Sequence, residues 1–343
     1  MKSAGQCNRR FPPVWYLLAA LSAALLLQEA AAARLSPHAS SDPSAGLAPK
    51  ALLDAGRVDE AIQTLQQQID HSPADAETYN LLCRAYFMLD EWDRGIPACE
   101  RARNLDPQKS MYHLWLGRIY GEKADRAGFL SAAGLAKKVR TSFERAVELD
   151  PRNWEARTDL AEFYLEAPGI VGGGKDKARA QAEAITPLNP AMSHWVIARI
   201  AEKEKDTASA EREYRDAIVA SHSGIRAWLD LASFLRHANR LDEMERALRN
   251  LEASPIDHPA ALMDGANMLL RTGRDFPLAV RLLRRYLSSG TVEEAPAFKA
   301  HDLLGQLLEK QGDRQSAAEQ YRIALSLAHS FTRAQENLKR MGH

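Results

Sequence analysis

Apolar side chains recur at helical spacing in the segment between residues 76 and 109. Tyr79, Leu82 and Tyr86 follow one another at intervals of three and four residues, which places them on one face of a helix. A second helical stretch runs up to Pro107, whose ring disfavours a helical conformation in the residue before it. The pattern therefore predicts two short antiparallel helices joined by a tight turn.

The same order of small and large residues returns along most of the chain at intervals of about 34 residues. A single match of this kind would be weak, whereas several matches in one register indicate a repeat array. The matching positions include Gly56, Ala61 and Leu65, then Gly95 and Ala102, then Leu116, Gly117, Tyr120 and Phe143, then Leu160, Ala161 and Tyr164, then Ala198, Ala210 and Tyr214, then Trp228, Leu231 and Ala232, then Ala266, Gly273 and Ala279, and finally Leu304, Gly305, Gly312, Ala317 and Tyr321.

This register resembles that of the tetratricopeptide repeat family, although Cys83 and Gly95 replace the small residues usual at their two positions. The resemblance covers about residues 44–329. It implies an all-α, right-handed solenoid of about eight helix-turn-helix repeats over residues 44–341, with residues 331–341 as a C-terminal capping helix. Abundant Ala, Leu, Glu, Arg and Gln support helices, and sparse Val, Ile and Thr argue against a large sheet.

Two adjacent repeats carry extra residues, near 122–138 and near 167–175. Both insertions fall between the two helices of their repeat, so we expect them side by side on one edge of the solenoid. One interpretation makes this edge a docking site, with Phe129 offered to a partner. The alternative is that the two insertions bury each other's apolar side chains.

The first 33 residues have the layout of a secretory signal peptide. Lys2, Arg9 and Arg10 form a basic head, an uncharged and mostly apolar run covers residues 14–27, and three alanines end at Ala33. That run is shorter than the roughly 20 residues a helix needs to cross a bilayer. We expect cleavage after Ala33, a linker over residues 34–43, and a periplasmic or secreted protein. The alternative, an uncleaved anchor, would hold the chain at a membrane.

Cys83 and Cys99 fall within one repeat, at positions that face the interior of its helix pair. In an exported protein such a pair is a candidate disulfide. Buried free thiols that fill space in the core are the alternative.

Charge and motifs point away from catalysis. The 45 basic residues equal the 45 acidic ones, so no net field attracts nucleic acid. The run from Gly169 to Lys175 approaches a phosphate-binding loop, but Asp176 stands where that motif needs a hydroxyl and a helix is expected before it. The ten histidines show no metal-ligand spacing. We expect no enzyme activity, no cofactor, no metal and no small-molecule substrate.

The family resemblance also implies which residues face the concave groove. They combine guanidinium groups with apolar side chains, a composition typical of binding hot spots. The candidate partner-binding residues are Arg84, Phe87, Met88, Leu114, Arg118, Trp195 and Arg199. The hypothesis is a groove for a peptide that carries carboxylates. The alternative is that the arginines pair with nearby glutamates, such as Arg199 with Glu162.

These observations predict a non-catalytic scaffold or adaptor of the cell envelope or the exterior, which binds a protein or peptide partner in its groove. Two other readings stay open. One is an accessory subunit or enzyme of an envelope biosynthesis or export system. The other is a self-assembling structural solenoid.

Overall fold

The computed structural model describes residues 47–342, apart from the side chains of Phe129 and Leu130. The predicted signal peptide (1–33) and linker (34–43) lie outside the described residues. Over 47–342 the chain is all-α, with one isolated bridge between Val292 and Ala295 as its only extended pairing. No helix among these residues combines the length and the apolar character needed to span a membrane.

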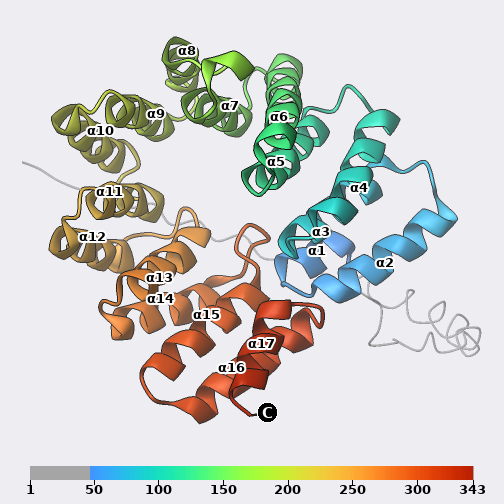
Figure 1. The fold of residues 1–343 in the computed structure, drawn as a ribbon, viewed down its shortest axis with the longest axis vertical. Coiled ribbons are helices and arrows are strands. Elements are labelled where there is room, and N and C mark those ends of the chain that lie inside the picture. Colours follow the sequence, from blue (N-terminus) through green and yellow to red (C-terminus); the bar gives the residue numbers. More distant parts are fainter. Residues whose placement is uncertain (1–46, 343) are drawn as a thin grey trace, which may run out of the picture. The chain divides into compact units, whose positions relative to one another are not determined.

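Consecutive helices pair antiparallel, as the repeat register predicts, and within 47–342 they form eight pairs followed by a capping helix (Figure 1). The pairs are α1 (Pro49–Asp54) with α2 (Val58–His71), α3 (Ala76–Met88) with α4 (Trp92–Leu105), α5 (Ser110–Asp125) with α6 (Phe129–Leu149), α7 (Trp154–Glu166) with α8 (Lys175–Ile185), α9 (Pro190–Lys203) with α10 (Thr207–Ala220), α11 (Ile225–His237) with α12 (Leu241–Ala253), α13 (Ala260–Thr272) with α14 (Phe276–Ser289), and α15 (Ala297–Lys310) with α16 (Arg314–Leu327); α17 (Thr332–Arg340) caps the array.

Small residues let the two helices of a pair approach closely. A Cβ atom built on Gly117 of α5 would lie 2.4 Å from a ring carbon of Phe143 on α6, and one on Gly305 of α15 would lie 2.5 Å from Tyr321 on α16. No side chain fits at these distances, so the ring of the second helix packs directly on the backbone of the first. The repeated small-and-large pattern is therefore the packing rule of each pair.

The insertion predicted near 122–138 takes a helical form. It lengthens α5 to 16 residues and α6 to 21 residues, and only residues 126–128 connect them. The insertion near 167–175 contains a short 3-10 helix, η1 (Gly169–Val171), which contacts α6. Val171 is buried there and its carbonyl accepts a hydrogen bond from Arg140, whereas Ile170 is 92% exposed. The second insertion therefore packs against α6, the helix that the first insertion lengthens.

The array of helices closes on itself. Figure 1 shows α15, α16 and α17 beside α1, α2 and α3. Thr291 donates to the carbonyl of Asp54 at 2.6 Å, and the Lys299 ammonium lies 2.9 Å from the Asp90 carboxylate. Ala297 packs against Gly56, where a Cβ atom would lie only 2.7 Å away. Because repeats of a solenoid ordinarily contact only their neighbours, this seam between the first and last repeats is an added feature of this chain.

Candidate binding surface on the inner face

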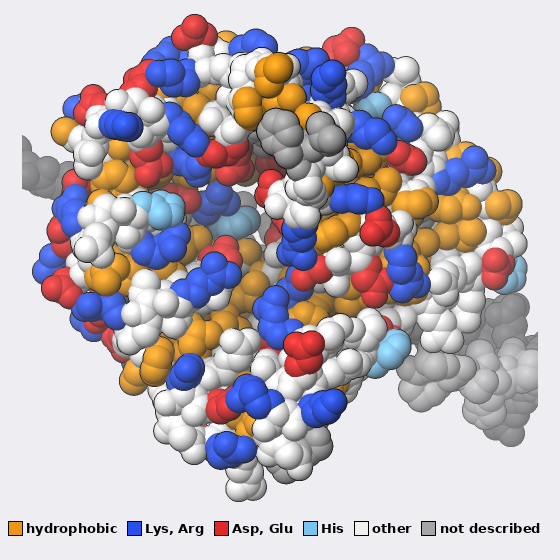
Figure 2. Space-filling model, viewed as in Figure 1, with side chains coloured by type: hydrophobic (Ala, Val, Ile, Leu, Met, Phe, Trp, Pro, Cys, Tyr) orange, Lys and Arg blue, Asp and Glu red, His pale blue; other side chains and the backbone are white. Residues whose placement is uncertain are grey.

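The first helix of each pair lies on the inner side of the closed array, and the second helix lies outside (Figure 1). Neighbouring inner helices contact one another from α1 with α3 round to α13 with α15, and the Arg118–Asp159 ion pair links α5 to α7. The inner surface is thus built from one helix per repeat, as the register predicts. Figure 2 shows a hollow near the middle of one face, with Asp and Glu side chains at its edge.

A cavity of about 590 Å³ opens on this inner surface along α5, α7, α9 and α11. Two indole rings, Trp154 and Trp195, form part of its wall. Its charged side chains are mostly acidic, with two guanidinium groups against six carboxylates. The lining carboxylates are Glu155, Asp159, Glu162, Asp230, Asp257 and Glu294, and the guanidinium groups are Arg118 and Arg226.

Each predicted groove arginine already has acidic partners within the chain. Arg118 donates to Asp159 at 2.7 Å. Arg199 donates to Glu166 at 2.7 Å and lies 3.9 Å from Glu162, so the pairing named as the alternative is present but is not the shortest. Carboxylates of the chain itself thus pair with both arginines, of which Arg118 lines the large cavity.

Burial changes the role of three predicted apolar residues. Leu114 is fully buried, and Met88 is only 2% exposed. The expected exposure of Leu114 in the groove is wrong, because adjacent inner helices α3 and α5 contact each other. Met88 still lines a small inner cavity beside Arg84 and Trp115. Trp195 is also buried, at 6% exposed, yet its edge forms part of the cavity wall and Arg199 lies 5.5 Å from its ring centroid.

The remaining predicted residues divide between two places. Phe87 is half-buried beside Trp92 and Trp115, with ring centroids 5.5 Å apart in both cases. Phe129 is the first residue of α6, next to the insertion near 122–138. Its side chain lies outside the described residues, so its predicted docking role stays a prediction.

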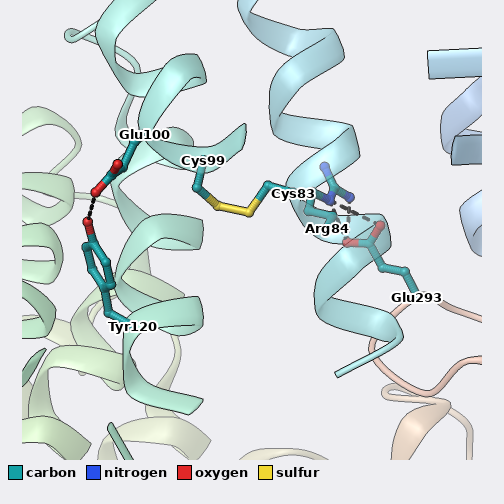
Figure 3. Close-up of a disulfide and its surroundings, with 6 residues drawn as sticks. All are labelled: Cys83, Arg84, Cys99, Glu100, Tyr120 and Glu293. Atoms are coloured by element: carbon teal, nitrogen blue, oxygen red, sulfur yellow. Dashed lines mark hydrogen bonds and ion pairs between the residues drawn. A yellow bond between two sulfur atoms is a disulfide. The ribbon is translucent and has the colours of Figure 1, made fainter. Parts of the chain in front are cut away.

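Arg84 of α3 lies at a second part of the inner surface, beside the seam. Its Nε atom donates to both carboxylate oxygens of Glu293, at 2.9 and 3.2 Å (Figure 3). Trp115 lies between two guanidinium groups, with Arg84 and Arg118 each 5.0 Å from its ring centroid. A smaller cavity of about 170 Å³ adjoins these groups and Glu294. We call this group (Arg84, Phe87, Trp115 and Arg118) the arginine end.

Buried carboxylates adjoin both the large cavity and the arginine end, where burial raises the pKa of Glu293 despite the nearby Arg84 guanidinium. Burial raises the pKa of Asp230, and Arg226, whose Nε lies 3.2 Å away, opposes this only in part. Burial also raises the pKa of Asp264 on the neighbouring helix α13. The carboxylates of the large cavity therefore lack full compensation by cations.

Residues 52–119 and residues 263–330 each match a sequence profile described as tetratricopeptide repeat. Both segments are tetratricopeptide repeats. The eight helix pairs carry the same architecture through the residues between them, so residues 47–342 form a tetratricopeptide solenoid with a closing seam.

Solved structures share this tetratricopeptide fold. Yeast Tom70 aligns with a TM-score of 0.50 and 17% identity over 83% of this chain, and this chain spans 58% of the length of that one. Two further likenesses are a tetratricopeptide protein of Thermus thermophilus (TM-score 0.46, 18% identity, 55% of this chain and 97% of that one) and a tetratricopeptide protein of Parabacteroides merdae (0.43, 13%, 86% and 96%). Identities this low show the fold alone. A comparison with curated proteins gives no match.

The second tetratricopeptide repeat contains the candidate cysteine pair. The structure joins Cys83 of α3 to Cys99 of α4 by a disulfide, with Cα atoms 5.1 Å apart (Figure 3). Both residues are fully buried. Cys83 precedes Arg84 in the chain, so the disulfide fastens to α4 the same turn of α3 that holds Glu293.

One group of side chains in the described repeats could offer metal ligands. His194, Glu213 and Asp216 bring their ligand atoms within 4.8 Å of one another on α9 and α10. The His194 ring nitrogen already makes a 2.8 Å contact with Glu213, and such acidic groups are common at protein surfaces. This group lies outside the two cavities.

At the arginine end, the sequence did not predict the roles of Trp115 and Glu293. Trp115 stands one position after Leu114, and the register gave no signal that its ring would separate two arginines. Glu293 lies in the connection between α14 and α15, outside the repeat pattern altogether. Only the path of the whole array brings Glu293 to Arg84.

Proposed function

We propose that this chain is a non-catalytic scaffold whose inner surface binds a segment of a partner protein. Tetratricopeptide repeats generally mediate interactions between proteins, and scaffolds of this fold are typically non-catalytic. The observation that supports this proposal most is the cavity of about 590 Å³, which combines two indole walls with charged groups on the inner face. Aromatic surface beside arginine is the composition of interaction hot spots.

The proposed place of action is outside the cytoplasm, in the periplasm or the medium. The basic head, the apolar run of 14–27 and the alanines that end at Ala33 support this part of the proposal. The mature chain would then begin at Arg34. Cell fractionation followed by intact-mass measurement checks both points, and a chain that keeps residues 1–33 would contradict the expected cleavage.

The test of binding uses a photo-crosslinking amino acid at two positions. Glu155 lines the cavity, whereas Arg212 is an exposed residue of the outer helix α10. We expect a partner captured from intact cells through position 155 and not through position 212.

The captured protein is then purified and its affinity measured directly. Ala220 lines the cavity, so Ala220→Trp fills part of it and should weaken binding, whereas Arg212→Trp on the outer surface should not. Capture through position 212 alone, or equal affinity in both variants, would contradict binding on the inner face.

A further inference from the structure

The connection between α14 and α15, residues 290–296, has an ordered shape of its own. Gly290 opens it with a left-handed φ of 102°, which glycine adopts without strain. The buried Tyr286 hydroxyl accepts a hydrogen bond from the Val292 N–H at 3.0 Å and donates one to the Ala295 carbonyl. This phenol thus fixes both sides of the connection and directs Glu293 outward from it.

Glu293 reaches the arginine end as a ligand would. Its side chain is only 3% exposed and that of Arg84 only 11% exposed. A guanidinium that donates to both oxygens of a carboxylate is the usual forked recognition of an acidic ligand. Glu294, the next residue, lines both cavities.

The sequence of the inner surface led us to expect a peptide with carboxylates on these arginines. In the closed array, Glu293 of the chain itself takes that place on Arg84, and the neighbouring Glu294 is exposed. The acidic excess of the large cavity disfavours a carboxylate there, which leaves the arginine end as the part of the inner surface where one is accepted.

In the closed array, a buried polar side chain on the same helix as Arg84 lacks hydrogen-bond partners in the part of the chain that the structure describes. Asn80 lies four residues before Arg84, on the same face of α3. It is fully buried, and neither its amide nitrogen nor its amide oxygen has a hydrogen-bond partner within the described residues. The Arg84–Glu293 pair has also lost its hydration, which offsets much of its attraction. Opening of the seam would hydrate Arg84 and Glu293.

We propose that residues 290–296 are a built-in ligand of the arginine end, and that an extended acidic segment of a partner binds Arg84 in place of Glu293. This inference rests on the proposed function, because it names the class of partner segment for the same inner surface. The seam then acts as a competitor, and the partner binds only the fraction of molecules in which the seam is open.

The test supplies the connection as a separate peptide. A fluorescent peptide that copies residues 287–299 is titrated into the full chain and followed by anisotropy. Glu293→Gln keeps the size of the side chain and removes its charge, so it should open the seam and bind the peptide on the order of tenfold more tightly than the unchanged protein. The matched control is Glu252→Gln, which removes an ion pair with Arg281 on the outer helices.

Two further measurements link binding to the arginine end. The radius of gyration from small-angle scattering should rise for Glu293→Gln and stay unchanged for Glu252→Gln. The double variant Arg84→Gln with Glu293→Gln should lose the peptide, and so should a peptide with Gln at the position of Glu293.

The inference is overturned if folded Glu293→Gln protein, open by scattering, binds the peptide no better than the unchanged protein. If this variant fails to fold, Thr291→Val removes the hydrogen bond to Asp54 with little change in shape and gives the same comparison. The experiments distinguish failure of this inference from failure of the proposed function. Crosslinking through position 155 with no peptide binding leaves the proposed function standing, and peptide binding without a captured partner leaves only the arginine end.

Discussion

Arg84 and Glu293 lie 209 residues apart in the sequence and form a buried ion pair that joins the second repeat to the seventh. Within residues 47–342 neither side chain has another oppositely charged partner as close, since Lys50 approaches Glu293 only to 3.9 Å. Loss of Arg84 therefore leaves the buried Glu293 carboxylate with Lys50 at 3.9 Å as its nearest cation.

Arg84→Leu should lower the free energy of unfolding by roughly 3–5 kcal/mol, because it strands the Glu293 carboxylate in the seam. The double variant Arg84→Met with Glu293→Leu removes both charges and should fall within about 2 kcal/mol of the unchanged protein. Urea unfolding followed by circular dichroism compares the three proteins. If the single and double variants lose the same stability, the contribution comes from packing and not from charge.

Removal of the disulfide should lower the free energy of unfolding by about 3 kcal/mol, the value expected for a cross-link that closes a loop of this size. The measurement uses a chain that begins at Arg34, which lacks Cys7, with and without reductant. Cys83→Ala with Cys99→Ala should be less stable than the oxidised protein and insensitive to reductant. An intact mass that does not change by two hydrogens on reduction would show that the thiols are free.

Two glycines of α5 offer an internal contrast. A Cβ at Gly117 would clash with Phe143, whereas a Cβ at Gly121 meets nothing within 4 Å. Gly117→Ala should therefore destabilise the protein by about 1–3 kcal/mol through overpacking. Gly121→Ala should stabilise it by up to about 1 kcal/mol, because alanine favours the helix. Thermal unfolding of both variants decides the point, and a stabilising Gly117→Ala would contradict the close packing of α5 on α6.

Asp302 should make the docking of the capping helix depend on pH. Its side chain is fully buried, accepts hydrogen bonds from Asn337 at 2.9 Å and Gln306 at 2.8 Å, and has its pKa raised by burial. A carboxyl whose pKa is higher in the folded state contributes stability at pH values below its unfolded pKa, and this contribution is lost as the pH rises through the folded pKa. The stability of α17 should thus fall as the pH rises from about 4 towards neutrality.

The check is thermal unfolding of the unchanged protein and of Asp302→Asn across this pH range. The amide keeps an acceptor for Asn337 and cannot ionise, so the variant should show a flatter dependence on pH. If both proteins lose stability in parallel as the pH rises, groups other than Asp302 cause the pH dependence.

The sequence was sufficient for the helix pairs because each one depends on local patterning. Gly117, Gly305 and their facing rings stand at fixed offsets, and the register predicts eight pairs and the cap. The site was harder to predict. The register placed Leu114 on the inner face, but contact between neighbouring inner helices buries it. Arg118 was expected to be free for a ligand, whereas Asp159 on the next inner helix takes it.

No local sequence pattern predicts the seam. Glu293 stands in a connection that follows no repeat position, and its meeting with Arg84 depends on the curvature summed over the repeats between them. A small change in the angle between neighbouring repeats would separate the two residues by many ångströms. The local sequence pattern determines the angle between neighbouring repeats only approximately. The closure of the array could therefore not be predicted from the sequence.

Closure also changes how the molecule must fold. Contacts within a repeat array are short in sequence, and such an array can begin to fold at any repeat and grow outward. The seam differs, because its contacts join residues 209 to 270 positions apart, as with Glu293 and Arg84 or His329 and Asp59. They can form only after every repeat between them has taken its final shape. The seam is therefore the last part to form, and a chain with even one unfolded repeat stays open.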